Sequence, residues 1–131
     1  MIVAMDCIFC KIIQGEIPHY KVYEDTQFLG FLDIFPRTEG HSLLIPKKHY
    51  RWVYDIPNFG EYWEAALKLS KKIRATMKPT YISFYTFGTQ VAHAHIQIMP
   101  MYTMGEGYPK PHKLDKEKAP ELAQKILAQT T

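Results

Sequence analysis

Polar and apolar residues alternate along residues 91–100, VAHAHIQIMP. Successive side chains of a β-strand point to opposite faces, so residues at alternate positions line up. The alternation predicts a strand over Val91–Met99, with His93, His95 and Gln97 together on one face. The opposite face would carry Ala92, Ala94, Ile96 and Ile98. Such a strand suits a polar site in front and a packed helix behind.

Short apolar runs separated by turn residues predict the other strands. These runs cover residues 20–24, 28–33, 41–46 and 81–85. The first three are joined by short connections, Asp25–Thr26 and the loop around Pro36–Gly40. Short connections favour strands that are antiparallel neighbours.

Three helices are expected around these strands. A short helix over residues 9–14 would end at Gly15, and a final short helix would begin near Pro120. The main helix would begin after Asn58 and end before Pro79, because its apolar residues recur at helical spacing. Those residues are Phe59, Tyr62, Trp63, Ala66, Leu69, Ile73 and Met77. The predicted class is α+β: one five-stranded antiparallel sheet, one long helix and short terminal helices.

Length and composition limit the architecture and the partners. A chain of 131 residues, 47% of them hydrophobic, suffices for one domain over 1–131, with a core of about 5–102 and a tail over 103–131. It has no apolar run long enough to span a membrane, and no signal peptide is recognisable, so we expect a cytoplasmic protein. The net charge of +3 is scattered along the chain, which favours a small anionic ligand over nucleic acid.

The cysteines Cys7 and Cys10 form a Cys-x-x-Cys pair. In a cytoplasmic protein such a pair is typical of half a metal site or of a redox motif rather than of a structural disulfide. A redox motif of the thioredoxin type would need a strand before the pair, and the residues upstream predict none. A zinc site would need two more ligands, which histidines can supply.

The histidine row itself indicates phosphoryl or nucleotidyl transfer. A neutral imidazole can attack phosphorus near pH 7 without a separate base, and His95 lies at the centre of the row. Just upstream, Gly88, Thr89 and Gln90 could offer backbone N–H groups to an anion. Metal binding is the alternative for the two histidines, and both readings hold if His93 binds the metal and His95 the substrate.

Several sequence blocks occur in one order: Cys7–Ile13, Gly15–Pro18, Val22–Asp25, Phe31–Ile34, Gly40–His49 and the row ending at Pro100. Through them the chain resembles the histidine-triad (HIT) family over its length up to Pro100. The resemblance implies a homodimer and a nucleotide, or nucleotide conjugate, bound against the sheet. It also implies a two-step reaction, in which the central histidine attacks the α-phosphorus and forms a nucleotidyl-histidine intermediate.

The resemblance assigns roles to individual residues. It makes His95 the nucleophile, supported by His41 on the adjoining strand, with Gln97 as the third catalytic position. The ribose would be held by Asp33 and Ile34 and the base by Ile8, Phe9 and Phe31. A structural zinc would be bound by Cys7, Cys10, His49 and His93, with His41 as a rival to His49.

The sequence departs from the family pattern at two places. Gln97 replaces the usual third histidine, and the loop over residues 84–90 is shortened and lacks the familiar asparagine. A glutamine amide cannot pass a proton to a leaving group at neutral pH.

Two hypotheses for the function follow from these residues. The first is an enzyme that transfers or hydrolyses a nucleoside monophosphate group of a dinucleoside polyphosphate, nucleotide sugar or phosphoramidate. The alternative is a catalytically weak, zinc-stabilised nucleotide-binding or scaffold dimer.

Overall fold

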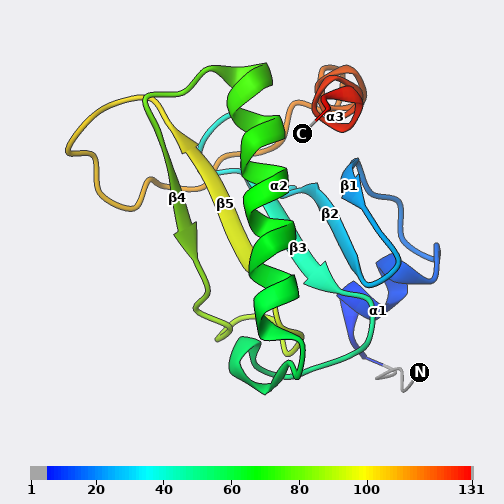
Figure 1. The fold of residues 1–131 in the computed structure, drawn as a ribbon. Helices are drawn as coiled ribbons and strands as arrows, with labels where there is room; N and C mark the ends of the chain where they lie inside the picture. Colours follow the sequence, from blue (N-terminus) through cyan, green and yellow to red (C-terminus); the bar gives the residue numbers. More distant parts are fainter. Residues whose placement is uncertain (1–5, 131) are drawn as a thin grey trace.

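The computed structural model describes residues 6–130 and contains one sheet and three α-helices (Figure 1). The strands are β1 (Lys21–Glu24), β2 (Phe28–Leu32), β3 (Ser42–Pro46), β4 (Tyr81–Tyr85) and β5 (Ile96–Met101). The helices are α1 (Ile8–Ile13), α2 (Phe59–Met77) and α3 (Ala119–Ala128), with a short 3-10 turn, η1 (Val53–Asp55). The predicted class, a five-stranded antiparallel sheet with one long helix and short terminal helices, is confirmed.

The strands follow the order β1-β2-β3-β5-β4, and every neighbouring pair is antiparallel. The segment from β1 to β3 is the expected meander. After β3 the chain crosses the sheet through α2 to the far edge, and β5 then fills the gap between β3 and β4 (Figure 1). This order places β5, which carries Gln97 of the histidine row, inside the sheet between β3 and β4.

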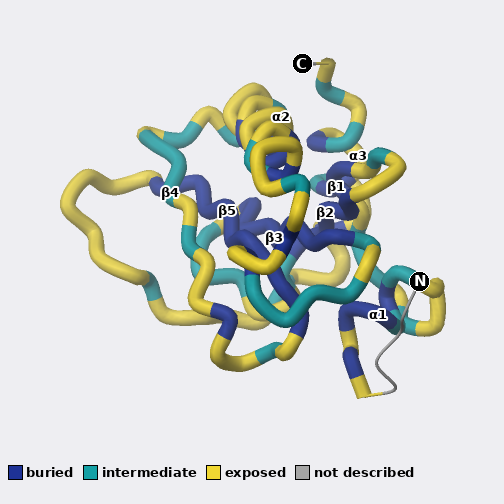
Figure 2. The backbone as a smooth tube through the Cα atoms, turned by 60° about the horizontal axis from the view of Figure 1, so that its bottom comes forward, coloured by how far each residue is buried: buried dark blue, intermediate teal, exposed yellow. Residues whose placement is uncertain are grey.

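Both faces of the sheet are covered, as the buried strands in Figure 2 show. Inward residues of α2 and α3, among them Leu69, Ile73 and Ile126, pack with Ala94, Ile96 and Ile98 in the main core. This confirms the predicted helix-facing side of the row at these three positions. On the opposite face, Phe9 and Ile12 of α1 pack on alternate residues of β2 and β3 in a smaller cluster. Because successive strand residues point to opposite faces, one set packs under α2 and α3 and the other faces α1, on the side where the site lies.

The row begins its regular strand later than predicted, since β5 starts at Ile96 and not at Val91. Residues 91–95 bend, and the Ala94 N–H donates a hydrogen bond to the Tyr50 carbonyl over 2.7 Å. This bond joins the segment to the loop after β3 rather than to a regular ladder.

The expected start of the main helix at Asn58 is confirmed, but its side chain makes no cap hydrogen bond. Instead, the Asn58 amide donates to Gln27 Oε1. Within residues 6–130 no helix is both long and apolar enough to cross a membrane.

Candidate active site and metal centre

Four side chains gather at the first residue of the histidine row: Cys7, Cys10, His49 and His93. Their ligand atoms, two Sγ and two Nδ1, all lie within 4.8 Å of one another. The Sγ to Nδ1 distances are 3.3 Å for Cys7 with His93 and 3.2 Å for Cys10 with His49. A tetrahedral zinc with ordinary bond lengths would set such nitrogen to sulfur distances at about 3.5 Å. The donor set and its spacing therefore fit one divalent metal ion.

The orientation of His93 supports the same conclusion. Its Nε2–H donates to the Pro46 carbonyl over 2.9 Å, so the lone pair lies on Nδ1, the atom that faces the cysteines. An outer hydrogen bond of this kind is usual for metal-binding histidines. Burial lowers the pKa of His93 to about 4, which keeps the ring neutral and able to bind a metal.

The structure also distinguishes the two rivals for the third ligand. His49 is in the cluster, with its Nδ1 3.1 Å from that of His93. His41 is not, because its Nε2 points to Gln97. His49 comes after β3 and contacts Cys10 of α1, whereas His41 comes just before β3 and contacts Gln97 of β5.

A cleft of about 430 Å³ lies on the α1 face of the sheet, beside the metal cluster. One part of its wall is apolar, and another part carries the polar side chains of Asp33, His95 and Gln97. All residues expected around the base and the ribose line it: Ile8, Phe9, Phe31, Asp33 and Ile34. The cleft thus combines an apolar wall, one carboxylate and a polar row.

His95 is held in a defined tautomer. Its Nδ1–H donates to the His93 carbonyl over 2.8 Å, which leaves the lone pair on Nε2. The ring packs edge-on against Phe9, with 5.4 Å between centroids. Burial lowers the pKa of His95, so the imidazole stays neutral at pH 7. A neutral, oriented imidazole in a cleft is suited to nucleophilic attack.

His41 connects the backbone to Gln97. The Arg37 N–H donates to His41 Nδ1 over 3.0 Å, so the proton of the neutral ring must lie on Nε2. That Nε2–H donates to Gln97 Oε1 over 3.1 Å, and an Asp33 carboxylate oxygen lies 3.6 Å away. Burial lowers the pKa of His41, while the Asp33 charge acts in the opposite direction. The Gln97 amide is therefore oriented with its oxygen toward His41.

The loop before the row contributes less than expected. Only Gln90 of the three loop residues lines the cleft. The Gly88 carbonyl accepts a hydrogen bond from Arg51 Nη1 over 2.8 Å, and Gly88 lines another hollow beside Trp52 that His95 also lines. Binding of an anion by the backbone N–H groups of Gly88 and Thr89 stays a prediction.

The lining residues that were not predicted from the sequence include three with polar groups, His19, Arg37 and Tyr108. Tyr108 comes from the tail after β5, and its hydroxyl donates to Gln97 Oε1 over 3.1 Å. Arg37 lies over the Tyr108 ring, 3.9 Å from its centroid. No periodicity marks these residues in the sequence. The only signal is the presence of aromatic and basic side chains in loops.

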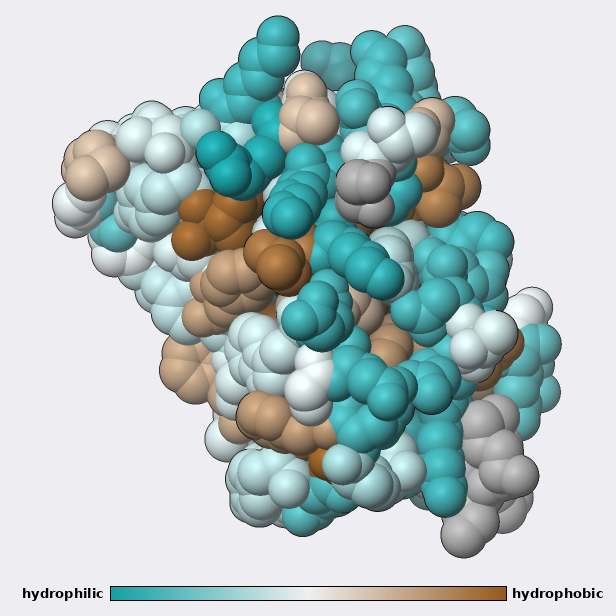
Figure 3. Space-filling model, in the orientation of Figure 1, coloured by the Kyte–Doolittle hydropathy of each residue, from teal (hydrophilic) through white to brown (hydrophobic). Residues whose placement is uncertain are grey.

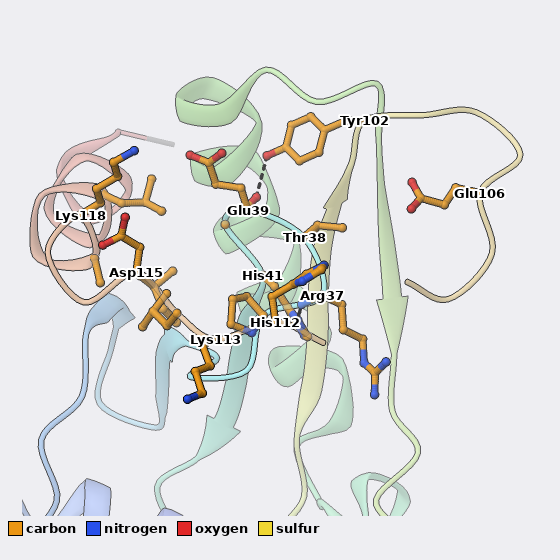
Figure 4. Close-up of a pocket in the computed structure, with 16 residues that line it drawn as sticks. Arg37, Thr38, Glu39, His41, Tyr102, Glu106, His112, Lys113, Asp115 and Lys118 are labelled. Atoms are coloured by element: carbon orange, nitrogen blue, oxygen red, sulfur yellow. Dashed lines mark hydrogen bonds between the residues drawn. The ribbon is translucent and has the colours of Figure 1, made fainter. Parts of the chain in front are cut away.

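A second cavity, of about 490 Å³, lies behind His41 and is lined by residues 36–41 and the tail (Figure 4). Its charged side chains have both signs, including Glu39, Asp115 and Lys118. Tyr102 donates across it to the Glu39 carbonyl, shown as the dashed line in Figure 4. Neither His95 nor Gln97 lines this cavity, so the cleft on the α1 face is the candidate active site.

Comparison with known sequences matches the HIT domain family over residues 14–104. The chain is 41% identical over 112 residues to Protein hit of Bacillus subtilis, covering 80% of this chain and 77% of that protein. It is 33% identical over 131 residues to the adenosine 5'-monophosphoramidase of Schizosaccharomyces pombe, covering 93% and 96%.

Solved structures agree with this match. A Hit-like protein of Bartonella henselae, described as involved in cell-cycle regulation and carrying an unknown ligand, has a TM-score of 0.86 at 31% identity, covering 98% of each chain. A zinc-bound histidine triad protein of Mycobacterium smegmatis has a TM-score of 0.77 at 32% identity, covering 95% of each chain. The family match spans most of the chain and includes the strands, the histidine row and most of the residues that line the cleft, and this chain therefore belongs to the HIT family.

Proposed function

We propose that this protein is a nucleotide hydrolase or nucleotidyltransferase that acts on the α-phosphate of a nucleotide conjugate through His95. The observation that carries the proposal is the fixed tautomer of His95, whose Nε2 lone pair is available at the polar part of the cleft. The homologous adenosine 5'-monophosphoramidase of Schizosaccharomyces pombe supports the same reaction class. The substrate would be a dinucleoside polyphosphate, a nucleotide sugar or a nucleoside phosphoramidate.

The lining of the cleft favours one orientation of a bound nucleotide, with the base at the apolar part and the phosphate at the polar part. Phe9, Phe31 and the half-exposed Ile34 offer apolar surface to a base. The Asp33 carboxylate can accept hydrogen bonds from the ribose hydroxyls. A base in the apolar part then leaves the α-phosphate near His95 and Gln97.

The reaction would proceed in two displacements. His95 Nε2 attacks the α-phosphorus and forms an N–P bond while the bond to the leaving group breaks. Water then attacks the same phosphorus, loses a proton, and releases the nucleoside monophosphate as the N–P bond breaks. An acceptor other than water would make the protein a transferase. In both steps the NH₂ group of Gln97 could donate to a phosphoryl oxygen, since its carbonyl oxygen is already engaged.

The substitution Gln97→His tests how the leaving group is protonated. A histidine can act as a general acid, so hydrolysis of nucleoside phosphoramidates should rise by roughly 10- to 100-fold. Hydrolysis of a nucleoside phosphate nitrophenyl ester, which has an acidic leaving group, should change much less. Steady-state rates on both substrates measure the difference. Equal changes on the two substrates would mean that Gln97 acts through geometry alone.

We infer that zinc is the metal of the four-residue cluster and that its role is structural. Two cysteines and two histidines are a ligand set typical of closed zinc sites, which leave no position open for substrate. A metal bound there would link α1 to the loop after β3 and to His93 of the histidine row. This link would hold Phe9 of α1 against His95. Two thiols kept for a metal also suit a reducing compartment such as the cytoplasm.

We propose that the protein forms a homodimer through the edge of the sheet at β4. This edge lacks a partner strand among residues 6–130, and large apolar side chains lie exposed beside it, including Phe59, Leu67 and Phe84. Figure 3 shows hydrophobic surface gathered next to α2 over β4. Two copies paired there would bury both the edge and the apolar surface.

Analytical ultracentrifugation tests this dimer. The wild-type protein should sediment with twice the mass of one chain, and Phe84→Glu should sediment as a monomer because it places a charge in the apolar contact. The exposed residue Glu117 provides a control, since Glu117→Ala should remain dimeric. A monomeric wild type at micromolar concentration would remove the dimer from the proposal.

A further inference from the structure

The tail after β5 crosses in front of the catalytic row at Tyr108. We define the strap as residues 104–111, which connect the end of β5 to the segment before α3. The Tyr108 hydroxyl donates to Gln97 Oε1 over 3.1 Å, and Tyr108 also lines the cleft. The strap thus places a hydrogen-bond donor on the residue that replaces the third histidine of the family pattern.

The position of the Tyr108 ring is fixed by several neighbours. The Arg37 guanidinium lies 3.9 Å from the ring centroid, and Arg37 Nη1 donates to the Pro109 carbonyl over 2.7 Å. The rings of Tyr85 and Phe87 pack against it at centroid distances of 4.9 and 5.5 Å. These contacts hold the strap to β4 and to the loop after β2 without using the Tyr108 hydroxyl.

Two donors therefore converge on one oxygen of Gln97, the Nε2–H of His41 and the hydroxyl of Tyr108. Rotating the amide by half a turn would place its NH₂ group against the Nε2–H of His41, which would lose its hydrogen bond, and would turn the accepting oxygen away from the Tyr108 hydroxyl. The donor left facing a donor at His41 disfavours the rotated form. The two donors leave the NH₂ group as the end of the amide available to a ligand.

We propose that Tyr108 is a positioning residue that acts through Gln97: it keeps the amide donor directed at the phosphoryl group in the cleft. The proposal rests on the function proposed above, because it needs a phosphoryl group beside His95. An amide N–H stabilises negative charge on a phosphoryl oxygen, whereas the amide oxygen repels it. Charge on those oxygens is rearranged during the displacement, so a misdirected amide should slow the chemical step more than it weakens binding.

Tyr108→Phe is the direct test, because it removes the hydroxyl and keeps the ring in its contacts. The value of kcat for hydrolysis of a nucleoside phosphate nitrophenyl ester should fall by roughly 5- to 10-fold, as expected for one hydrogen bond, with KM nearly unchanged. Tyr85→Phe is the matched control. Tyr85 pairs with Gln97 across the ladder between β4 and β5 and its ring packs on Tyr108, but the hydroxyl and the N–H group that bond Gln97 Oε1 are those of Tyr108 and His41, so the variant should keep kcat.

A double-mutant cycle separates positioning from simple packing. In the Gln97→Ala background, Tyr108→Phe should change kcat by less than about 2-fold, because the residue through which Tyr108 acts is gone. An undiminished 5- to 10-fold effect in that background would overturn the proposal. The proposal would also be overturned if Tyr108→Phe, made in the otherwise wild-type protein, raised KM and left kcat unchanged.

A measurement without turnover keeps this proposal separate from the proposed function. The side-chain amide of Gln97, assigned in an NMR spectrum by its loss in Gln97→Ala, should shift on Tyr108→Phe and stay in place on Tyr85→Phe. An unshifted amide in Tyr108→Phe would contradict the hydrogen bond itself. If the amide shifts as expected while the protein never forms a phosphorus bond to His95, the proposed function has failed and the positioning contact has not.

Discussion

Replacing His95 by alanine is expected to abolish the labelling of the protein by a nucleoside monophosphate group and to lower turnover by about 10⁴-fold or more. Losses of this size are typical when the nucleophile of a covalent mechanism is removed. The fold should survive, because His95 faces the cleft, and its truncation extends a solvent-filled space rather than opening a sealed cavity. We therefore expect the Tm to change by only about 3 °C.

His19 provides a matched control for this experiment. It also lines the cleft and packs against Phe31, but it lies outside the row. His19→Ala should retain covalent labelling and most of the turnover. A His95→Ala variant that keeps its turnover would show that another group performs the attack, and the mechanism proposed here would be wrong.

Loss of the metal is expected to have the largest effect on stability. Cys7→Ser removes one thiolate from a buried four-ligand site, and the three ligands that remain should bind zinc much more weakly. The loss of free energy of unfolding should be about 3 kcal/mol or more, as for other losses of a metal site. For a chain of this length the Tm should then fall by about 10 °C.

Metal analysis and calorimetry together test this prediction. The wild-type protein, purified without chelator, should contain about one zinc per chain, and Cys7→Ser should contain much less. His112→Ala changes an exposed histidine of the tail and should alter neither the zinc content nor the Tm. An unchanged Tm in Cys7→Ser, or a wild type without zinc, would remove the structural metal from the account.

The elements with strong periodicity could be predicted from the sequence. The buried residues of α2 recur at helical spacing and so predict the helix, and β2 and β4 are predicted as apolar runs between turn residues. The late start of β5 could not be predicted in this way. Residues 91–95 alternate like a strand, but they are held by the Tyr50 carbonyl and by the cysteine and histidine cluster.

The candidate site was predictable where residue type alone limits the chemistry. The cysteine pair and the row indicated a metal and a nucleophile, but the choice of His49 over His41 depends on how the chain leaves β3. Tyr108 gave no signal, because its contact with Gln97 comes from the path of a loop without periodicity. Gly88 did stand out in the sequence, but the bond from Arg51 to its carbonyl depends on the path of the loop after β3 and could not be predicted.

Intact-mass spectrometry of the quenched reaction tests the central claim most directly. The wild-type protein, mixed with a nucleoside phosphate nitrophenyl ester and quenched within its first turnovers, should gain the mass of one nucleoside monophosphate group. Fragmentation should place the added mass on His95, and His95→Ala should gain none. Substrate turnover by the wild type without any added mass, together with turnover by His95→Ala, would contradict the nucleotidyl-histidine intermediate.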